Sequence, residues 1–410
     1  MKIAIVTQYY APESIRIPES LATELVSRGH SVRVITGYPN YPSGRIFDGY
    51  RMRFNDVAEV DDVELRRVPL YISHSYNALA RFLNYFSFAV SAAMFGWWIR
   101  RADVVYVYAT QMTPAVGPSI WRRIFRLPYV LHIQDLWPES ITGSSMAGGK
   151  RSKSAIAAIL NPWLRMLYRT ASATIAIAPS MSEMLIDRGV PAERAHHVWN
   201  WATPEPGESG ALRGVDGSDA INVVYAGNFG DHQDLETVIR AAKLVEDVPS
   251  LTLTLVGSGV AESRLKKLAR ELSIRNVQFV GRVPPEEMDK IHRMSDFQLV
   301  TLLDLEIFRG TIPSKFQAAI SAGKPVITTV QGDVAALVQA HSVGIACAPG
   351  SPQALADGLR RASAMSAGDR TAMSGRARAL YESELSRSSG VDKIERILHD
   401  VRRTTQSKDW

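Results

Sequence analysis

The chain has 410 residues, of which 46% are hydrophobic, and a formal net charge of +6. This length exceeds one typical domain, so two domains are expected. The basic pI of about 9.3 fits an anionic ligand or membrane face. The sequence shows no RNA-binding aromatic motif, zinc finger or dense basic block, which disfavours nucleic acid as a partner, and its single cysteine, Cys347, excludes an internal disulfide.

The N-terminal half begins as an alternation of strands and helices. The apolar run 3–7 predicts a central strand; it is too short for a signal peptide, so we expect a cytoplasmic protein. A helix over 18–28 and a strand over 31–36 follow, an order typical of a doubly wound α/β domain. The first turn lacks G-x-G-x-x-G, which disfavours a dinucleotide dehydrogenase.

Polar loops follow these first two strands, at the strand ends where open α/β sheets bind ligands. Glu13 and Arg16 lie in the first loop, and Arg45 lies in the turn-rich second loop as a candidate contact for a lipid phosphate. Ordinary solvated loop side chains explain these residues equally well.

The segment 78–99 is the most apolar of the chain and is flanked by Arg81, Arg100 and Arg101. Two interpretations stay open: a helix of the protein core, and a helix lying in a membrane interface with its arginines at the headgroups. Polar residues interrupt the segment, which disfavours a full membrane span.

The strongest motif of this half follows a strand predicted over 129–133. It reads His132-Ile-Gln-Asp-Leu-Trp-Pro-Glu and brings His132, Asp135 and Glu139 to the end of that strand. We predict that His132 points toward the ligand there, and that Asp135 or Glu139 accepts a proton from a reacting hydroxyl. No Asp-x-Asp pair is placed for a metal, since Asp61-Asp62 falls in a predicted surface hairpin.

The second half repeats the α/β pattern after a linker predicted over 204–220. A strand over 222–226 leads into Gly227 and Gly230, whose backbone amides can approach a phosphate. Strands over 251–256 and 277–280 follow, the second ending at Gly281-Arg282.

The stretch from Glu306 to Ile327 predicts a loop, a helix, a turn and a strand. Pro313 opens the helix and Gly323 ends it. Free amides at the helix start, with Arg309, Ser314 and Lys315 nearby, predict an anion site suited to a diphosphate. An ordinary helix start with solvated cations is the equal alternative. A strand over 343–348 and two helices complete the chain.

The motifs 132–139, 227–235 and 313–327 resemble those of the GT-B glycosyltransferases, in particular the family-4 type that builds bacterial surface polysaccharides. The resemblance covers nearly the whole chain. It implies an α/β fold of two doubly wound, Rossmann-like domains facing across a cleft. The implied parts are an acceptor-binding domain over 1–203, the linker 204–220, a nucleotide-sugar domain over 221–385, and a final segment 386–410 whose helix returns to the first domain.

The resemblance also assigns site residues. It makes His132 the residue that faces the donor sugar and phosphate, and Glu13, Arg16 and Arg45 acceptor-side residues. The donor residues that it implies are Gly227, Asn228, Gln233, Gly281, Arg282, Arg309, Gly310, Ser314, Lys315 and Gln317. Two acids of the family fall on Arg309 and Gln317, and its loop cations fall on Asn228 and roughly Gln233. Because of these departures, we expect the negative charge of the diphosphate to be balanced by Lys315, Arg309 and helix termini.

The implied reaction moves a sugar, for example an N-acetylamino sugar, from a nucleoside diphosphate to a hydroxyl of a lipid-linked glycan at the inner membrane face. The family precedent is retention of configuration without a bound metal or other cofactor, and UDP is favoured over GDP. Two alternatives stay open: an epimerase of the same fold, and a non-catalytic binding protein, which the loss of acids at Arg309 and Gln317 favours.

Overall fold

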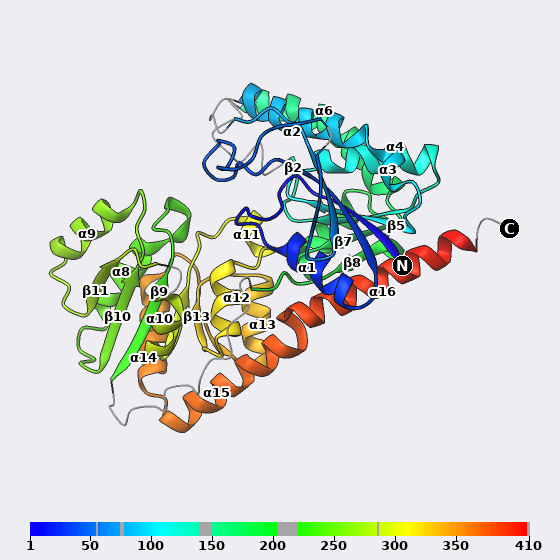
Figure 1. Cartoon of the computed structure of the whole chain (residues 1–410). Helices are drawn as coiled ribbons and strands as arrows, with labels where there is room; N and C mark the ends of the chain where they lie inside the picture. Colours follow the sequence, from blue (N-terminus) through cyan, green and yellow to red (C-terminus); the bar gives the residue numbers. More distant parts are fainter. Residues whose placement is uncertain (55, 74–77, 139–149, 203–219, 285–286, 408–410) are drawn as a thin grey trace. The chain divides into compact units, whose positions relative to one another are not determined.

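The protein forms two doubly wound α/β units, seen in the computed structural model of Figure 1. Unit 1 comprises Met1–Asn200 and Gly390–Trp410, and unit 2 comprises Trp201–Ser389. The structure describes residues 1–54, 56–73, 78–138, 150–202, 220–284 and 287–407. The predicted fold class is confirmed, while the predicted linker, apart from Ala220, lies outside the described residues.

Unit 1 is built on one sheet with the strand order β3-β4-β2-β1-β5-β6-β7-β8. Its strands are parallel, except that β3 runs antiparallel to β4. The bounds are β1 Lys2–Val6, β2 Ser31–Gly37, β3 Asp56–Val60, β4 Val63–Val68, β5 Val104–Ala109, β6 Tyr129–Ile133, β7 Ala173–Ala176 and β8 Ala195–His197. Strand order reverses between β1 and β5, so the loops after these strands flank the position where such sheets bind ligands.

Helices cover both faces of this sheet. Figure 1 shows α2, α3, α4 and α6 along one side, and α1 and α16 along the other. The bounds are α1 Ile17–Ser27, α2 Ala78–Ala93, α3 Gly96–Ile99, α4 Val116–Ile124, α6 Lys150–Thr170, α7 Pro179–Asp187 and α16 Arg387–Gln406. This double cover explains why every residue of β5 and β6 is buried.

Two local predictions for unit 1 can be scored. The two-residue turn Asp61-Asp62 does close a hairpin, and both residues have the left-handed φ that such turns require. The apolar segment 78–99 is not one helix, because Met94 and Phe95 separate α2 from α3.

Unit 2 contains a six-stranded sheet that is parallel throughout, in the order β11-β10-β9-β12-β13-β14. The strands are β9 Ile221–Ala226, β10 Leu251–Val256, β11 Val277–Gly281, β12 Phe297–Val300, β13 Val326–Thr328 and β14 Gly344–Ala346. The helices are α8 Leu235–Leu244, α9 Glu262–Glu271, α10 Met288–Met294, α11 Glu306–Arg309, α12 Ser314–Ser321, α13 Asp333–His341, α14 Pro352–Ser363 and α15 Ala367–Leu380. Strand order reverses here between β9 and β12, which puts the loop after β9 at the expected ligand position.

Two predictions for this part of the chain were wrong. Residues Glu306–Arg309 form the short helix α11 where a loop was expected. After β14 the described chain forms three α-helices, α14, α15 and α16, and not two, with a π-helical turn over Tyr381–Leu385 before the last. Residues from Gly390 onward group with unit 1, although they follow unit 2 in sequence.

Candidate functional site

In unit 2, the loop after β9 and the start of α12 bring Gly227, Gln233 and Lys315 together. The Nζ of Lys315 donates a hydrogen bond to Oε1 of Gln233 at 2.8 Å and lies 5.2 Å from the ring centre of Tyr225. A Cβ at position 227 would stand 2.3 Å from Cε of Lys315, so glycine is required for the lysine to pass. The resemblance assigned Gly227, Gln233 and Lys315 to the donor site, but neither their contact nor the part taken by Tyr225 was predicted.

The charge of Lys315 faces neutral partners. Gln233 supplies an amide oxygen and Tyr225 a ring face, and burial lowers the pKa of Lys315 to about 8. A dianionic ligand beside Lys315 would stabilise the charged form of its ammonium group, which burial disfavours. Lys315 is the second residue of α12, and Ser314 is exposed as the first, so free helix amides point the same way as the lysine.

A hollow of about 380 Å³ adjoins this loop. Its lining residues are Gly227, Asn228, Val256, Gly257, Ser258, Arg282, Val283 and Met288. The loops that form it approach so closely that a Cβ at Gly257 would lie 1.9 Å from the carbonyl oxygen of Gly227. The amide of Gly257 also donates to the carbonyl of Gly281 at 2.7 Å, which places Gly281 and Arg282 beside the Gly227 loop. The volume falls within the range of small-ligand sites.

Arg309 has a carboxylate partner that sequence reasoning missed. Its Nη2 lies 3.0 and 3.1 Å from the two oxygens of Asp304, and its Nε donates to the same group at 3.2 Å. Arg309 therefore has an anionic partner in this structure, whereas the partners of Lys315 are neutral. Gly310 follows α11 directly, and Gln317 is buried on α12.

His132 is the fourth of the five residues of β6, the position predicted for it at the end of the strand 129–133, and its side chain is fully buried. The rings of Tyr106 and Tyr108 meet it edge-on at 5.8 and 5.9 Å. Burial lowers the pKa of His132 to about 3, so the imidazole is neutral near pH 7.

The contact with Tyr106 assigns a tautomer to this histidine. The Tyr106 hydroxyl bonds to Nδ1 of His132, and burial raises the pKa of Tyr106 well above its usual value, so the hydroxyl keeps its proton. We assign the hydroxyl as the donor, because a proton on Nδ1 would leave the phenol proton without an acceptor among the described residues. With this assignment the ring proton of His132 is on Nε2, which is buried and has no hydrogen-bond partner among the described residues. The result is one oriented N–H donor. Nothing in the sequence marked Tyr106, which lies in an apolar strand.

The residues after β6 continue this polar row. Gln134 is two residues beyond His132, on the same face by strand alternation, and its Oε1 accepts from Nδ2 of Asn200 at 2.7 Å. Asp135 has an accessible surface, yet many protein atoms lie around its carboxyl group and partly desolvate it, which raises its pKa. A carboxylate with a raised pKa is a better proton acceptor. Glu139 lies outside the described residues.

Glu13 has a different place from the one expected of an acceptor residue. It is fully buried, and its carboxylate accepts from the backbone amides of Asn40 and Tyr41 at 2.8 Å and of Tyr10 at 3.1 Å. It therefore ties together the loops after β1 and β2. Arg16 pairs with Glu19 at 2.7 Å, and Arg45 is exposed.

The α2 region has a buried and an exposed apolar face. Phe88, Ala92 and Ile99 are buried, and Nε1 of Trp121 in α4 donates to the carbonyl of Ala93 at 3.0 Å. The opposite face exposes apolar side chains, each between 40% and 58% accessible: Phe82, Leu83, Phe86, Val90, Met94 and Trp97. Ile120, Ile124 and Phe125 add to the exposed apolar surface at α4. Among the described helices, none is long and apolar enough to cross a membrane.

Comparisons with known proteins identify the family that this chain resembles. The family model described as "Glycosyl transferase 4-like domain" matches residues 16–201, and the one described as "Glycosyl transferases group 1" matches residues 216–380. A relative in Escherichia coli (strain K12), WcaI, bears the name of a candidate colanic acid biosynthesis glycosyl transferase. It is 28% identical over 382 residues, which cover 88% of this chain and 92% of WcaI.

Solved structures match over almost the full length. HepE from Anabaena, in complex with UDP and glucose, matches with a TM-score of 0.64 at 17% identity, covering 97% of this chain and 99% of HepE. WaaG, a glycosyltransferase involved in lipopolysaccharide biosynthesis, matches with a TM-score of 0.59 at 17% identity, covering 97% and 99%. These matches show a shared fold.

Proposed function

The chain belongs to the family-4 type of GT-B glycosyltransferases, and on this premise we propose that it transfers a sugar from UDP to a hydroxyl of a lipid-linked glycan. The family assignment makes it an enzyme of sugar transfer. The choice of UDP is supported by HepE, which binds UDP and glucose, and the polysaccharide pathway by the names of WcaI and WaaG.

The observation that carries the donor assignment is the contact of Lys315 with Gly227 and Gln233. A half-buried ammonium group above a glycine loop, at the start of a helix, is a cradle for a diphosphate. We propose that Lys315 and the helix amides stabilise the charge that develops on the leaving UDP, in place of a metal ion. The hollow bounded by Asn228, Gly257 and Arg282 then takes the nucleoside.

For the chemical step we propose that His132 and Asp135 have separate roles. The Nε2–H of His132 donates to an oxygen of the donor, and its neutral state keeps it a donor across the physiological range. Asp135, with its raised pKa, accepts the proton of the attacking hydroxyl. The configuration at the sugar is retained in this proposal, following the precedent of the family.

We also propose that the exposed apolar face of α2, α3 and α4 attaches the enzyme to the inner surface of the cell membrane. Aromatic side chains of α2 would enter the interface while Arg100 and Arg101 meet anionic headgroups. This attachment would bring the enzyme to a lipid-linked acceptor.

Calorimetry tests the donor assignment directly. The protein is titrated with UDP, GDP and uridine in buffer containing EDTA. The proposal expects UDP to bind more tightly than GDP, and more tightly than uridine because of its diphosphate. Tighter binding of GDP would overturn the choice of base, and binding that appears only after a divalent metal is added would overturn the metal-free donor site.

A further inference from the structure

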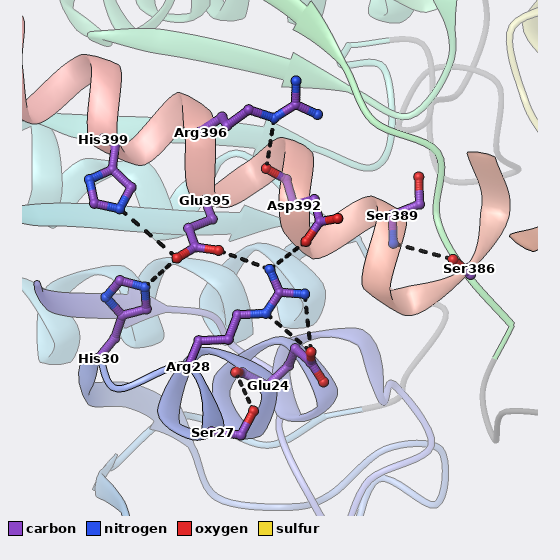
Figure 2. A network of polar contacts seen from close by, with 10 residues as sticks. All are labelled: Glu24, Ser27, Arg28, His30, Ser386, Ser389, Asp392, Glu395, Arg396 and His399. Carbon is purple, nitrogen blue, oxygen red and sulfur yellow. Dashed lines mark hydrogen bonds and ion pairs between the residues drawn. The ribbon is translucent and has the colours of Figure 1, made fainter. Parts of the chain in front are cut away.

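In unit 1, the side chains of two histidines and one glutamate, His30, His399 and Glu395, lie close together (Figure 2). His30 lies in the turn between α1 and β2, and Glu395 and His399 lie one helical turn apart on α16. Oε1 of Glu395 is 2.7 Å from Nε2 of His30 and 3.9 Å from Nε2 of His399. One carboxylate oxygen is therefore shared by two imidazole nitrogens from different elements.

The chemistry and spacing of this set suit a zinc ion. Two imidazoles and one carboxylate form a common zinc donor set, and ligand atoms on tetrahedral zinc stand about 3.4 Å apart, given metal–ligand bonds near 2.1 Å. The three ligand atoms lie within 4.8 Å of one another. The side chain of His399 is 48% exposed, so it can move toward the other two without disturbing packed residues. A solvent molecule would complete the coordination.

Neighbouring side chains already orient the ligands. Nη1 of Arg28 donates to Oε2 of Glu395 at 2.8 Å, which leaves Oε1 directed at the histidines. With zinc on Nε2, the ring proton of His30 is on Nδ1, which lies 3.0 Å from the nitrogen of Met1, so the Met1 amino group accepts this proton's hydrogen bond only when it is deprotonated. Metal ligands are usually held by such outer contacts.

The charge around the cluster is compatible with a cation. Arg28 contacts three carboxylates, those of Glu24, Asp392 and Glu395, and Arg396 lies nearby on α16. Three carboxylates and two guanidinium groups leave one net negative charge when the histidines and the Met1 amino group are neutral, and no net charge when that amino group is protonated.

We propose that His30, Glu395 and His399 bind a divalent zinc ion that fastens α16 to the turn between α1 and β2. The zinc takes the place of the proton between Nε2 of His30 and Glu395, and the neutral ring then carries its proton on Nδ1. This site is structural and separate from sugar transfer, which in our account needs no metal. It would hold the end of the chain, from Gly390 on, against the N-terminal residues of its own unit.

The test uses the full chain, purified without a polyhistidine tag and freed of metal with EDTA that is then removed. Titration with zinc chloride should show one equivalent bound, and zinc should raise the unfolding temperature. His399→Ala is the informative variant, because His399 takes little part in the Arg28 and His30 contacts that hold the helix. It should bind zinc at least about tenfold more weakly and lose the thermal shift.

His341→Ala is the matched control. Its Nε2 lies 3.5 Å from Oε1 of Glu384 in unit 2, and no third ligand joins that pair among the described residues. This variant should bind zinc like the parent. No saturable zinc binding by the parent, or equal affinity of the His399→Ala variant and the parent, would overturn the proposal. Magnesium should not compete, because imidazole ligands disfavour it.

Discussion

At the scale of single residues, burial gives the two polar groups of the proposed mechanism opposite tasks. Lys315 is a cation made less stable by desolvation, so an anion beside it is favourable. His132 is buried so deeply that it stays neutral, and a tyrosine sets its tautomer. Lys315 therefore contributes a positive charge, whereas His132 contributes a neutral, oriented N–H donor. Ligand affinity tests the first role and reaction rate tests the second.

The role of Lys315 predicts both a mutational and a pH effect. Lys315→Ala should weaken UDP binding by about 1–3 kcal/mol, the scale of a charge-assisted hydrogen bond, and leave uridine binding nearly unchanged. Because the free lysine loses its proton near pH 8, UDP affinity of the parent should fall as pH rises above 8, and the variant should lack this fall. Calorimetry at several pH values measures both effects.

Lys266→Ala serves as the control for charge removal, since Lys266 lies on the surface and pairs with Glu262 at 2.7 Å. It should bind UDP like the parent. Equal losses for UDP and uridine in Lys315→Ala would instead place Lys315 outside the phosphate site.

For the histidine we expect a loss of rate without a loss of donor affinity. His132→Ala should lower kcat by about 10²–10³, the effect of removing one preorganised donor. Asp135→Asn should reduce transfer to acceptor more than hydrolysis of the donor by water.

Tyr106→Phe should lower kcat about tenfold, because it leaves Nδ1 of His132 without its hydrogen-bond donor and no longer favours the tautomer with the proton on Nε2.

The double variant decides whether Tyr106 acts through His132. Tyr106→Phe should add little in the His132→Ala background, and Tyr108→Phe should behave like the parent, because Tyr108 contacts His132 by its ring. Wild-type kcat in His132→Ala would remove the histidine from the mechanism. Additive losses in the double variant would show that Tyr106 acts by another route.

At the scale of elements, the sequence predicted what local pattern determines. The run at 129–133 is β6, which is buried on both faces, and the run at 251–256 is β10, in which leucines are buried and the alternating threonines are partly buried. Roles that depend on distant partners were not predictable: Glu13 binds amides 27 and 28 residues away, and Tyr106 meets a histidine from the next strand. The site residues of unit 2 were named, but Asp304 as partner of Arg309 was not.

The exposed face of α2 predicts salt-dependent membrane binding. The stacked rings of Phe82 and Phe86 should enter the interface, so a Phe82→Ser, Phe86→Ser variant should bind anionic phospholipid vesicles on the order of tenfold more weakly per ring. Added salt should weaken binding of the parent. Co-sedimentation at low and high salt measures this, with Val260→Ser, an exposed apolar site of unit 2, as control. Failure of the parent to bind at low salt would leave α2 as a core helix only.

Packing of α3 against α4 predicts a stability effect. An added Cβ at Gly96 would lie 2.2 Å from Nε1 of the buried Trp121, so Gly96→Ala should lower the free energy of unfolding by about 1–3 kcal/mol. Gly375→Ala, in the exposed middle of α15 with open space around it, should raise that free energy by about 0.5–1 kcal/mol. Chemical denaturation of both variants makes the comparison. Equal stability of Gly96→Ala and the parent would contradict the close packing.

At the scale of the whole molecule, the proposed functions fall on different units. Residues proposed to hold the donor, such as Gly227, Gln233 and Lys315, belong to unit 2, while His132 and Asp135 belong to unit 1. Donor binding and sugar transfer should therefore be separable by mutation. Each unit has its own sheet and its own buried residues, and the last residues of the chain, from Gly390, belong to unit 1.

The most direct test of sugar transfer follows a labelled sugar from its UDP donor. The protein is incubated with a panel of labelled UDP-sugars and a lipid extract carrying glycan acceptors, in EDTA, and label is measured in the lipid fraction alongside released UDP. We predict that one UDP-sugar gives lipid-bound label in proportion to UDP, and that Lys315→Ala lowers the yield. An epimerised UDP-sugar formed without acceptor, or a UDP-sugar that binds but is never consumed with any acceptor, would contradict this account.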